Sequence, residues 1–560
     1  MSSKRSVLQT SQQFLVLVLA SAAFTGIAAS AQDDQPANPI FTPGNILVSR
    51  SVYYNDRYLV PVGQILPPFC SRVPGGCAAP TGAPFDGTYP TVWNNNLYDG
   101  SFGVTSKILL DQLTPIGSLV STIEVPNNQT WRIQPNSDQL VTSFSSKSEL
   151  SLNLSTSHRY VTFMGYVATI GRLDLSNSST PGVVDPTNPV GEAVYRAVAK
   201  LDRYGNFSFT ETNAYSGNNG RAAILNDSIH SFYTAGNAGN GANPEPAGVL
   251  LGAGAQLIPE ATTTEYLQSP ATPTPVGSFN VTQLGVKADK IGKDDNFRGM
   301  TIFNNVLYYT KGSGGNGVNT VYFVDTTGTA CPNGTGLPVA GAALPTTPLS
   351  YDAAKLVKSG LPSNICILTG FPTNPAKTTT VTAFPFGIWF ANAKTVYVAD
   401  EGDGYQGGSD LYTHAAAQTT AGLQKWIFNS TAQSWQLAYV LQNGLNLGQT
   451  YPVAPSARTH QAYPTTINAA TGLPWSPATD GLRNITGRFT GDDTVTIWAI
   501  TSTISGSGDQ GADPNQLVSF TDNIENTDPI NVAPATILKT AGFGEVLRGV
   551  SLTPGTDSDN

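Results

Sequence analysis

Four arginines occupy matched positions in short repeated motifs of this sequence. The motifs are GRAAI, FRGMT, LRNIT and LRGVS, and the arginines are Arg221, Arg298, Arg483 and Arg548. A fifth motif, PFGIWF, carries Phe386 at the same position. A guanidinium is a planar, permanently charged fork that suits carboxylate and phosphate groups. These five residues are therefore the candidate ligand-binding set, and the ligand that they predict is a small anion.

Carboxylates close to these arginines offer a structural alternative. An arginine that is paired with a carboxylate of its own or a neighbouring repeat would have a structural role. The two roles are compatible, because a partly paired arginine can still contact a ligand. The candidate partners are Asp294 and Asp295 before Arg298, Asp480 before Arg483, and Glu545 before Arg548.

Glycine-rich polar segments with acidic residues follow several of the hydrophobic runs. The segment ADEGDGYQGGSD, residues 399–410, contains Asp400 and Glu401, and residues 502–515 contain Asp509. Carboxylate oxygens are the ligands that calcium prefers, so these three residues are candidate calcium ligands. Asp400, at the end of a strand-like run, is also a candidate catalytic residue. The spacing does not match an EF-hand, and solvated turn residues are the alternative.

Histidine is scarce, with four residues in the chain. His460 lies in a long irregular segment, residues 450–482, and such insertions on rigid scaffolds often determine specificity. It is the candidate general base. The chain contains no G-x-S-x-G elbow, no HExxH motif and no phosphate-binding glycine loop before a helix. These absences argue against classical hydrolase, zincin and nucleotide-binding functions.

The elements that must position these residues are β-strands. Short β-branched and aromatic runs recur between Gly, Pro, Asn and Asp, which is typical of strands and turns. Four runs form a unit, and the unit repeats every sixty to seventy residues or so. Such repeats predict the four-stranded antiparallel blades of a β-propeller. The units span residues 149–210, 221–284, 297–368, 385–442 and 483–542.

The two ends of the chain supply a sixth unit. One strand, LRGVSLTP at residues 547–554, follows the last complete unit, and three strands precede the first. Together they predict one composite blade that closes the ring and removes open sheet edges. The expected fold is all-β, a single six-bladed propeller. A seventh blade, a pair of β-sandwiches and a β-solenoid are the alternatives. In the unit at residues 221–284 the fourth strand is expected near GSFNVTQ, residues 277–283.

Turns at one end of each blade should gather the candidate residues. In a propeller, the turn that enters the innermost strand and the turn between the second and third strands open on the same face. We therefore expect the arginines and the glycine-rich acidic segments to meet at one mouth of the central channel.

Several runs resemble those of secreted propeller proteins whose function is uncharacterised. They are PFGIWFANAKTVYVADEG, GLQKWIF and SGSGDQGADPNQLVSFTD, and the resemblance extends over most of the mature chain. More distantly, six-bladed secreted propellers include calcium-dependent lactonases and esterases, strictosidine-synthase-like enzymes, quinoprotein sugar dehydrogenases and alkaline phytases. The sequence lacks the full catalytic motif set of each of these. The resemblance implies an architecture and a short list of activities.

The N-terminus predicts export. Lys4 and Arg5 precede an apolar run at residues 14–24, and Ala29-Ser30-Ala31 fits a signal-peptidase site. We expect a signal peptide over residues 1–31 and a propeller domain over residues 32–560, in a secreted, extracellular protein (periplasmic or at the cell surface in a bacterial host). An uncleaved anchor is the alternative, and no second membrane-spanning run follows. Nine N-x-[ST] sequons permit glycosylation in a eukaryotic host.

The four cysteines agree with an oxidising compartment. Cys70 and Cys77 bracket a small loop, so we expect them to form one disulfide, and Cys331 and Cys366 to form the other. A zinc site is the alternative, but the spacing is not CxxC.

Composition excludes other classes of protein. Charged residues make up 12% of the chain, against about 25% in an average protein. The 22 Tyr, 23 Phe and 7 Trp exclude disorder, and a net charge of -9 argues against nucleic acid as a partner. The sequence thus predicts a monomer that binds a small anionic ligand, a glycan or an extracellular partner at the channel face. A calcium-dependent enzyme of the lactonase, esterase, lyase or sugar dehydrogenase kind is one alternative, and an extracellular matrix structural protein is another.

Overall fold

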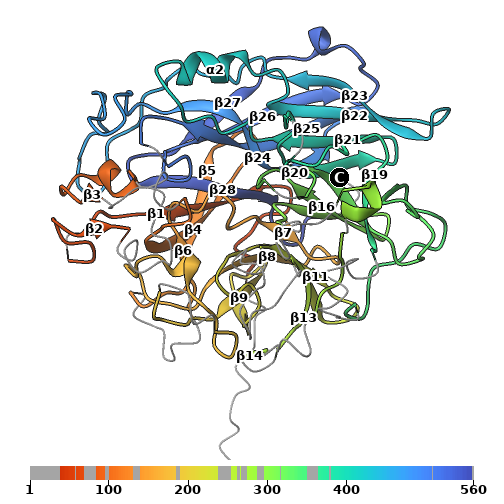
Figure 1. Ribbon diagram of the computed structural model, residues 1–560, viewed down its shortest axis with the longest axis horizontal. Helices are drawn as coiled ribbons and strands as arrows, with labels where there is room; N and C mark the ends of the chain where they lie inside the picture. Colours follow the sequence, from red (N-terminus) through yellow and green to blue (C-terminus); the bar gives the residue numbers. More distant parts are fainter. Residues whose placement is uncertain are drawn as a thin grey trace, which may run out of the picture. The chain divides into compact units, whose positions relative to one another are not determined.

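Antiparallel β-sheets dominate the computed structural model of the chain (Figure 1). Pro39–Asn560 forms one compact unit. Residues 1–37, the predicted signal peptide included, lie outside the described part of the chain, as do Cys70 and Cys77. The structure describes residues 38–560 except 57, 68–82, 95–99, 130–138, 185–189, 238–253, 262–264, 267–273, 280, 287–295, 316, 350–362, 378–379, 508 and 558–560.

Six sheets form the blades, which we number in chain order from the composite one. Blade 1 contains β28 (Glu545–Leu552), β1 (Ile46–Val52), β4 (Thr105–Leu113) and β5 (Leu119–Glu124), with β6 (Thr142–Ser143) paired to β4. Blade 2 contains β7 (Asn153–Leu154), β8 (Tyr160–Tyr166), β9 (Arg196–Asp202), β10 (Phe207–Thr212) and β14 (Glu265–Tyr266). Blade 3 contains β11 (Gly220–Asn226), β12 (Ser231–Gly236) and β13 (Ala255–Pro259).

The remaining blades are more regular. Blade 4 contains β15 (Met300–Phe303), β16 (Val306–Lys311), β17 (Thr320–Val324), β19 (Ile365–Leu368) and β18 (Thr335–Gly336). Blade 5 contains β20 (Pro385–Asn392), β21 (Thr395–Asp400), β22 (Gly422–Asn429) and β23 (Ser434–Leu441). Blade 6 contains β24 (Ala478–Phe489), β25 (Thr494–Ile504), β26 (Gln516–Asn523) and β27 (Thr536–Thr540).

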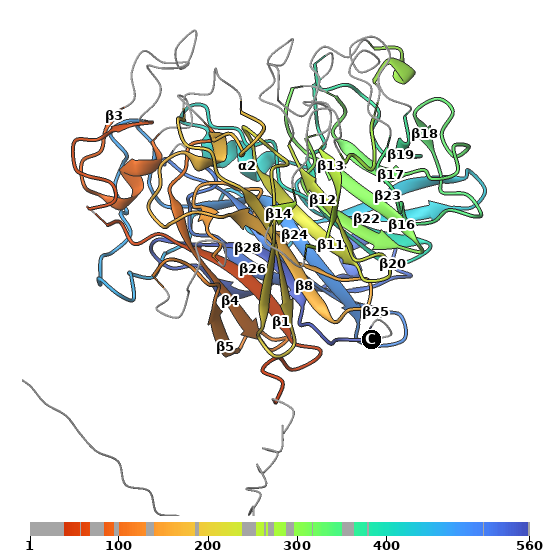
Figure 2. The same cartoon turned by 90° about the horizontal axis from the view of Figure 1, so that it is seen from below.

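Several short elements lie in the loops between the strands of the blades. They are the pair β2 (Ile65–Leu66) and β3 (Ala83–Pro84), the helix α2 (Leu411–Ala417), and the 3-10 turns η2 (Tyr89–Trp93), η3 (Leu175–Asn177), η4 (Val281–Leu284) and η5 (Pro529–Asn531). Viewed from the side, β3 and α2 lie toward one face and the C-terminal end toward the other (Figure 2). No helix in the described part of the chain is both long and apolar enough to cross a membrane.

The prediction of an all-β, six-bladed propeller with mostly four-stranded antiparallel blades is confirmed. The prediction of a fourth strand near GSFNVTQ is wrong, because residues from this stretch form η4 instead. Of the expected disulfides, Cys331–Cys366 is confirmed, with the two Cα atoms 5.9 Å apart. It ties the segment after β17 to β19.

Both ends of the chain contribute to blade 1. Strand β28 pairs antiparallel with β1, from Ile46 opposite Leu552 to Val52 opposite Glu545, and β1 pairs with β4 on its other side. The innermost strands of the six blades contact one another in the order β28, β7, β11, β15, β20 and β24, and β24 contacts β28. These strands surround the axis at which the candidate site lies.

The core lies between neighbouring blades. Strands β11 and β12 are buried at every position, because each blade packs against a neighbour on both of its faces. Tyr233 of blade 3, for example, belongs to the same apolar cluster as Tyr309 and Tyr322 of blade 4. The outermost strands β5 and β27 are exposed or half-buried instead. This burial explains why the inner strands read as continuous apolar runs and do not alternate.

Candidate functional site

The four arginines lie in or directly before innermost strands. Arg221 is in β11, Arg298 comes two residues before β15, Arg483 is in β24 and Arg548 is in β28. All four are buried, with 2–6% of each residue exposed. The fifth candidate, Phe386, is buried in β20, and its ring lies 5.9 Å from the guanidinium of Arg298.

Glycines explain why the motif repeats. Gly299, directly after Arg298, lies so close to β20 that a Cβ there would collide with the carbonyl oxygen of Phe386. Gly387, directly after Phe386, lies equally close to β24, where a Cβ would come 2.5 Å from the carbonyl oxygen of Arg483. The close approach of neighbouring innermost strands therefore requires glycine, and it places the preceding side chains at matched positions around the axis.

The arginines are electrostatic neighbours. Burial lowers the pKa of Arg221, and the charge of Arg298 lowers it further. Burial and the charge of Arg483 also lower the pKa of Arg298, whereas the charge of Glu401 opposes this shift. Burial and Arg483 lower the pKa of Arg548 to about 9. The site thus concentrates positive charge in a region from which water is largely excluded.

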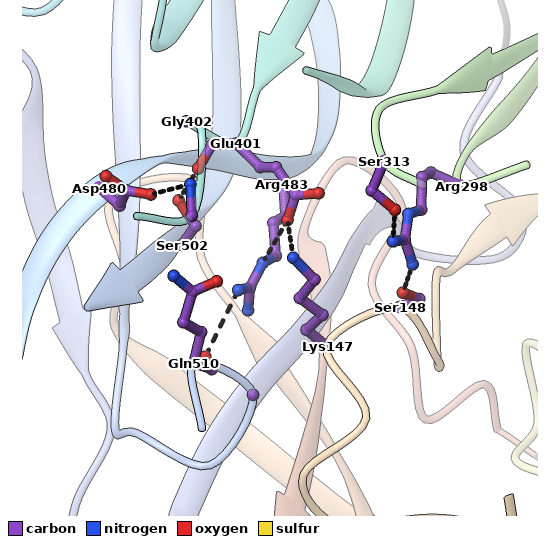
Figure 3. Close-up of polar contacts among 12 residues, drawn as sticks. Lys147, Ser148, Arg298, Ser313, Glu401, Gly402, Asp480, Arg483, Ser502 and Gln510 are labelled. Atoms are coloured by element: carbon purple, nitrogen blue, oxygen red, sulfur yellow. Dashed lines mark hydrogen bonds and ion pairs between the residues drawn. The ribbon is translucent and has the colours of Figure 1, made fainter. Parts of the chain in front are cut away.

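Arg483 is paired with a carboxylate from blade 5. Glu401 Oε2 lies 3.4 Å from Arg483 Nε and 3.2 Å from Lys147 Nζ (Figure 3). Burial alone would raise the pKa of Glu401, but Lys147, Arg298 and Arg483 hold it below its ordinary value. The expectation that Asp480 pairs with Arg483 is wrong: Asp480 accepts hydrogen bonds from the Gly404 N–H and the Gln418 amide.

Arg548 is held by neutral oxygens. It donates to Ser51 Oγ at 3.3 Å and to the carbonyl oxygen of Gly511 at 2.8 Å, and also to the carbonyl oxygen of Phe144. The expectation that Glu545 pairs with Arg548 is wrong as well, because Glu545 lies 2.5 Å from Arg50 across the pairing of β28 with β1.

Arg298 and Arg221 form no ion pair with a carboxylate among the described residues. Arg298 donates to the hydroxyls of Ser148 and Ser313. Arg221 donates to Asn219 Oδ1 at 3.0 Å, to the carbonyl oxygen of Phe297 at 2.6 Å and to the Asn296 side chain. Asp294 and Asp295, the candidate partners of Arg298, lie outside the described residues.

Both of these arginines line one cavity, which we call the arginine cavity. Its volume is about 280 Å³, and Lys147, Arg221, Arg298, Asp509 and Gln510 line it together with serines, asparagines and glycines. A second cavity of about 260 Å³ shares Lys147 and is lined by Glu401 and by glycines of the segments 312–315 and 401–404. Of the predicted glycine-rich segments, residues 502–515 contribute Asp509 to the arginine cavity, and residues 399–410 contribute Glu401 to the second cavity.

The predicted metal ligands do not form one centre. Asp400 accepts hydrogen bonds from the Phe384 and Gly402 N–H groups and from the Gln424 amide, and burial raises its pKa to about 7. The oxygens of Asp400, Glu401 and Asp509 are not all within 4.8 Å of one another. These three carboxylates therefore do not converge on one calcium ion.

Asp509 lies in the arginine cavity and is 4% exposed. Its Oδ1 accepts the Gly511 N–H at 2.9 Å, and its Oδ2 has no hydrogen-bond partner among the described residues. Burial raises the pKa of Asp509 to about 7, and the charge of Asp513 adds to this effect, whereas the Gly511 N–H and Arg548 oppose it.

His460 is exposed and does not line the arginine cavity. Its backbone has a positive φ of 57° and donates to the Ser456 carbonyl at 2.9 Å. The structure therefore does not bring His460 together with the arginines.

Four residues that line the arginine cavity were not predicted from the sequence: Lys147, Ser148, Asn219 and Gln510. Lys147 and Ser148 come directly before the repeat unit that begins at residue 149, whereas Arg221, Arg298 and Arg483 are the first or second residues of their units. Repeat register therefore gave no signal for these two residues. Asn219 and Gln510 come from loops, and no sequence pattern distinguishes them from the many other polar loop residues.

Comparisons with known proteins do not assign a function. No protein-family model matches the chain, and no curated protein does. Among solved structures, a protein from Lactobacillus plantarum, a structural genomics target, matches with 9% identity over 79% of this chain and 81% of its own. Its TM-score is 0.31, so the comparison carries no argument about the site.

Proposed function

We propose that the protein binds a small anionic ligand in the arginine cavity. The observation that carries this proposal is the pair Arg221 and Arg298, two buried guanidiniums that line the same cavity without a carboxylate partner among the described residues. A buried charge is costly unless an opposite charge accompanies it. A bound anion would supply that charge.

The distribution of carboxylates supports the same site. Glu401 contacts Lys147 and Arg483, so it leaves Arg221 and Arg298 without a direct counter-ion. The hydroxyls and amides around the cavity can fix the orientation of a ligand. The alternative of a calcium-dependent enzyme has weaker support, because its predicted metal ligands do not converge.

The proposal includes the compartment. The N-terminal pattern supports secretion, and the disulfide Cys331–Cys366 is typical of proteins that fold in an oxidising environment. The ligand would then be an extracellular anion, either free or as part of a glycan.

A thermal-shift series tests the anion site. The wild-type protein is melted with sulfate, citrate or glucuronate, against sodium chloride at equal ionic strength. A ligand that binds only the folded state stabilises it by about 2.7 kcal/mol at a concentration of 100 Kd. We expect at least one of these anions to raise the Tm of the wild type and to lose this effect in Arg298→Gln.

Arg159→Gln is the matched control. It also removes one positive charge, but the Arg159 side chain is 67% exposed and does not line the arginine cavity. This variant should respond to anions as the wild type does. Equal responses in all three proteins, or no response in the wild type, would contradict the proposal.

A further inference from the structure

The lining of the arginine cavity combines cations, one carboxylate and neutral polar side chains. Lys147, Arg221 and Arg298 can only donate hydrogen bonds, an ionised Asp509 can only accept them, and the serine, asparagine and glutamine side chains can do both. Such a lining fits a ligand that both accepts and donates hydrogen bonds.

Arg298 and Asp509 decide which ligand chemistry fits. The oxygen and nitrogen of an amide side chain can exchange places, so the roles of Asn237 and Gln510 depend on orientation. A guanidinium can only donate, and an ionised carboxylate can only accept. Sulfate would satisfy Arg298, but it has no hydrogen for Asp509 and is repelled by its charge. A molecule with both a carboxylate and hydroxyls satisfies both residues.

We infer that the ligand is a hydroxylated carboxylate of the sugar-acid class, whose carboxylate contacts Arg221 and Arg298 and whose hydroxyl donates to Asp509. This inference rests on the proposed anion site. Asp509 lines the same cavity as Arg221 and Arg298, so a ligand whose carboxylate lies at the arginines can present a hydroxyl to the Asp509 carboxylate. The volume of 280 Å³ lies just below the range of about 300–1,000 Å³ that is usual for small-molecule pockets, which favours a single sugar unit.

Calorimetric titration with three related ligands tests this inference. Glucuronate has a ring carboxylate and hydroxyls, cyclohexanecarboxylate has the ring carboxylate without hydroxyls, and glucose has hydroxyls without the carboxylate. The titration is run at pH 8, where Asp509, with its pKa of about 7, is mostly ionised. We expect the wild type to bind glucuronate about tenfold or more tightly than each of the other two ligands.

Asp509→Ala separates the role of the acceptor from that of the arginines. It should weaken glucuronate binding about tenfold, and it should leave cyclohexanecarboxylate and sulfate bound as well as before or better, since a repelling charge is gone. If this variant does not melt cooperatively, the affinities of the wild type for the three ligands still test the inference.

The outcomes separate the two proposals. Equal affinity of the wild type for glucuronate and cyclohexanecarboxylate would overturn the sugar-acid inference and leave the anion site intact. No binding of either carboxylate or of sulfate would overturn the anion site itself, and the inference with it.

Discussion

Arg298 and Arg483 occupy the same position in their repeats, yet they have different partners. Arg483 neutralises the buried Glu401, whereas Arg298 contacts two serine hydroxyls. Removal of one partner from a buried ion pair costs about 3–5 kcal/mol. Because Lys147 still contacts Glu401, we expect Arg483→Gln to cost somewhat less, about 2–3 kcal/mol.

Arg298→Gln should behave in the opposite way. It removes a desolvated charge and breaks no ion pair among the described residues. Glu401 loses the favourable charge of Arg298 but keeps its contacts with Lys147 and Arg483, so the ligand-free protein should lose less than about 1 kcal/mol or become more stable. Denaturant unfolding of both variants checks this. Equal destabilisation by the two substitutions would show that Arg298 also has a structural counter-ion.

Repeat register predicted where the arginines lie, but it did not predict their partners. The expected partners Asp480 and Glu545 are close in sequence, while the observed partner Glu401 comes from the neighbouring blade. The partner depends on how loops of adjacent blades pack, and a single sequence carries no pattern for that packing. Asp509 was named as a calcium ligand, but the structure places it in the arginine cavity.

Buried carboxylates predict how stability depends on pH. Burial raises the pKa of Asp400, Asp480 and Asp509 to about 7 and that of Asp513 to about 6. An unfolded aspartate has a pKa of about 3.9. Between about pH 4 and pH 7 the folded state therefore holds more protons than the unfolded state, so stability falls as the pH rises through this window.

We accordingly expect a higher Tm at pH 5 than at pH 8, measured by calorimetry at constant ionic strength. Asp513→Asn should reduce the difference, because the neutral side chain does not titrate. A Tm that is higher at pH 8 would mean that these carboxylates are ionised in the folded protein at little cost.

At the scale of the elements, the strands were more predictable than the loops. The spacing of apolar runs located β28, β1 and β4 because buried strands leave a strong local pattern. Blade 3 departs from the four-stranded pattern, since η4 takes the place of the expected last strand. A Gly- and Asn-containing stretch such as GSFNVTQ has weak strand preference, so its packing decides its conformation.

Strand β28 gives a prediction about the junction of the two chain ends. Deletion of residues 547–560 removes the partner of β1 and the buried side chains Leu547, Val550 and Leu552. The exposed edge and the lost apolar contacts should give an insoluble protein or one with a much lower Tm.

A shorter deletion, of residues 557–560, is the control, because it leaves β28 and the buried Thr556 in place. It should have little effect on solubility or melting. A soluble product of the longer deletion with an unchanged Tm would contradict the view that β28 closes the ring of blades.

At the scale of the whole molecule, the propeller brings distant segments to one axis. Lys147, Arg298 and Asp509 come from three different parts of the chain, yet they line one cavity. Low overall charge makes this concentration of cations more distinctive, since charged residues are only 12% of the chain. The fold class could be predicted because the strand pattern of the sequence repeats. The cavity could not, because it is lined by loops whose sequences do not repeat.

The central claim is that Arg221 and Arg298 hold an anion in this cavity, and crystallography tests it most directly. Crystals of the mature protein soaked in selenate, an analogue of sulfate that scatters anomalously, should show an anomalous peak in the arginine cavity within hydrogen-bond distance of both guanidiniums. The peak should be absent from Arg298→Gln crystals treated in the same way. A wild-type cavity without a peak, or a peak that persists unchanged in the variant, would contradict the claim.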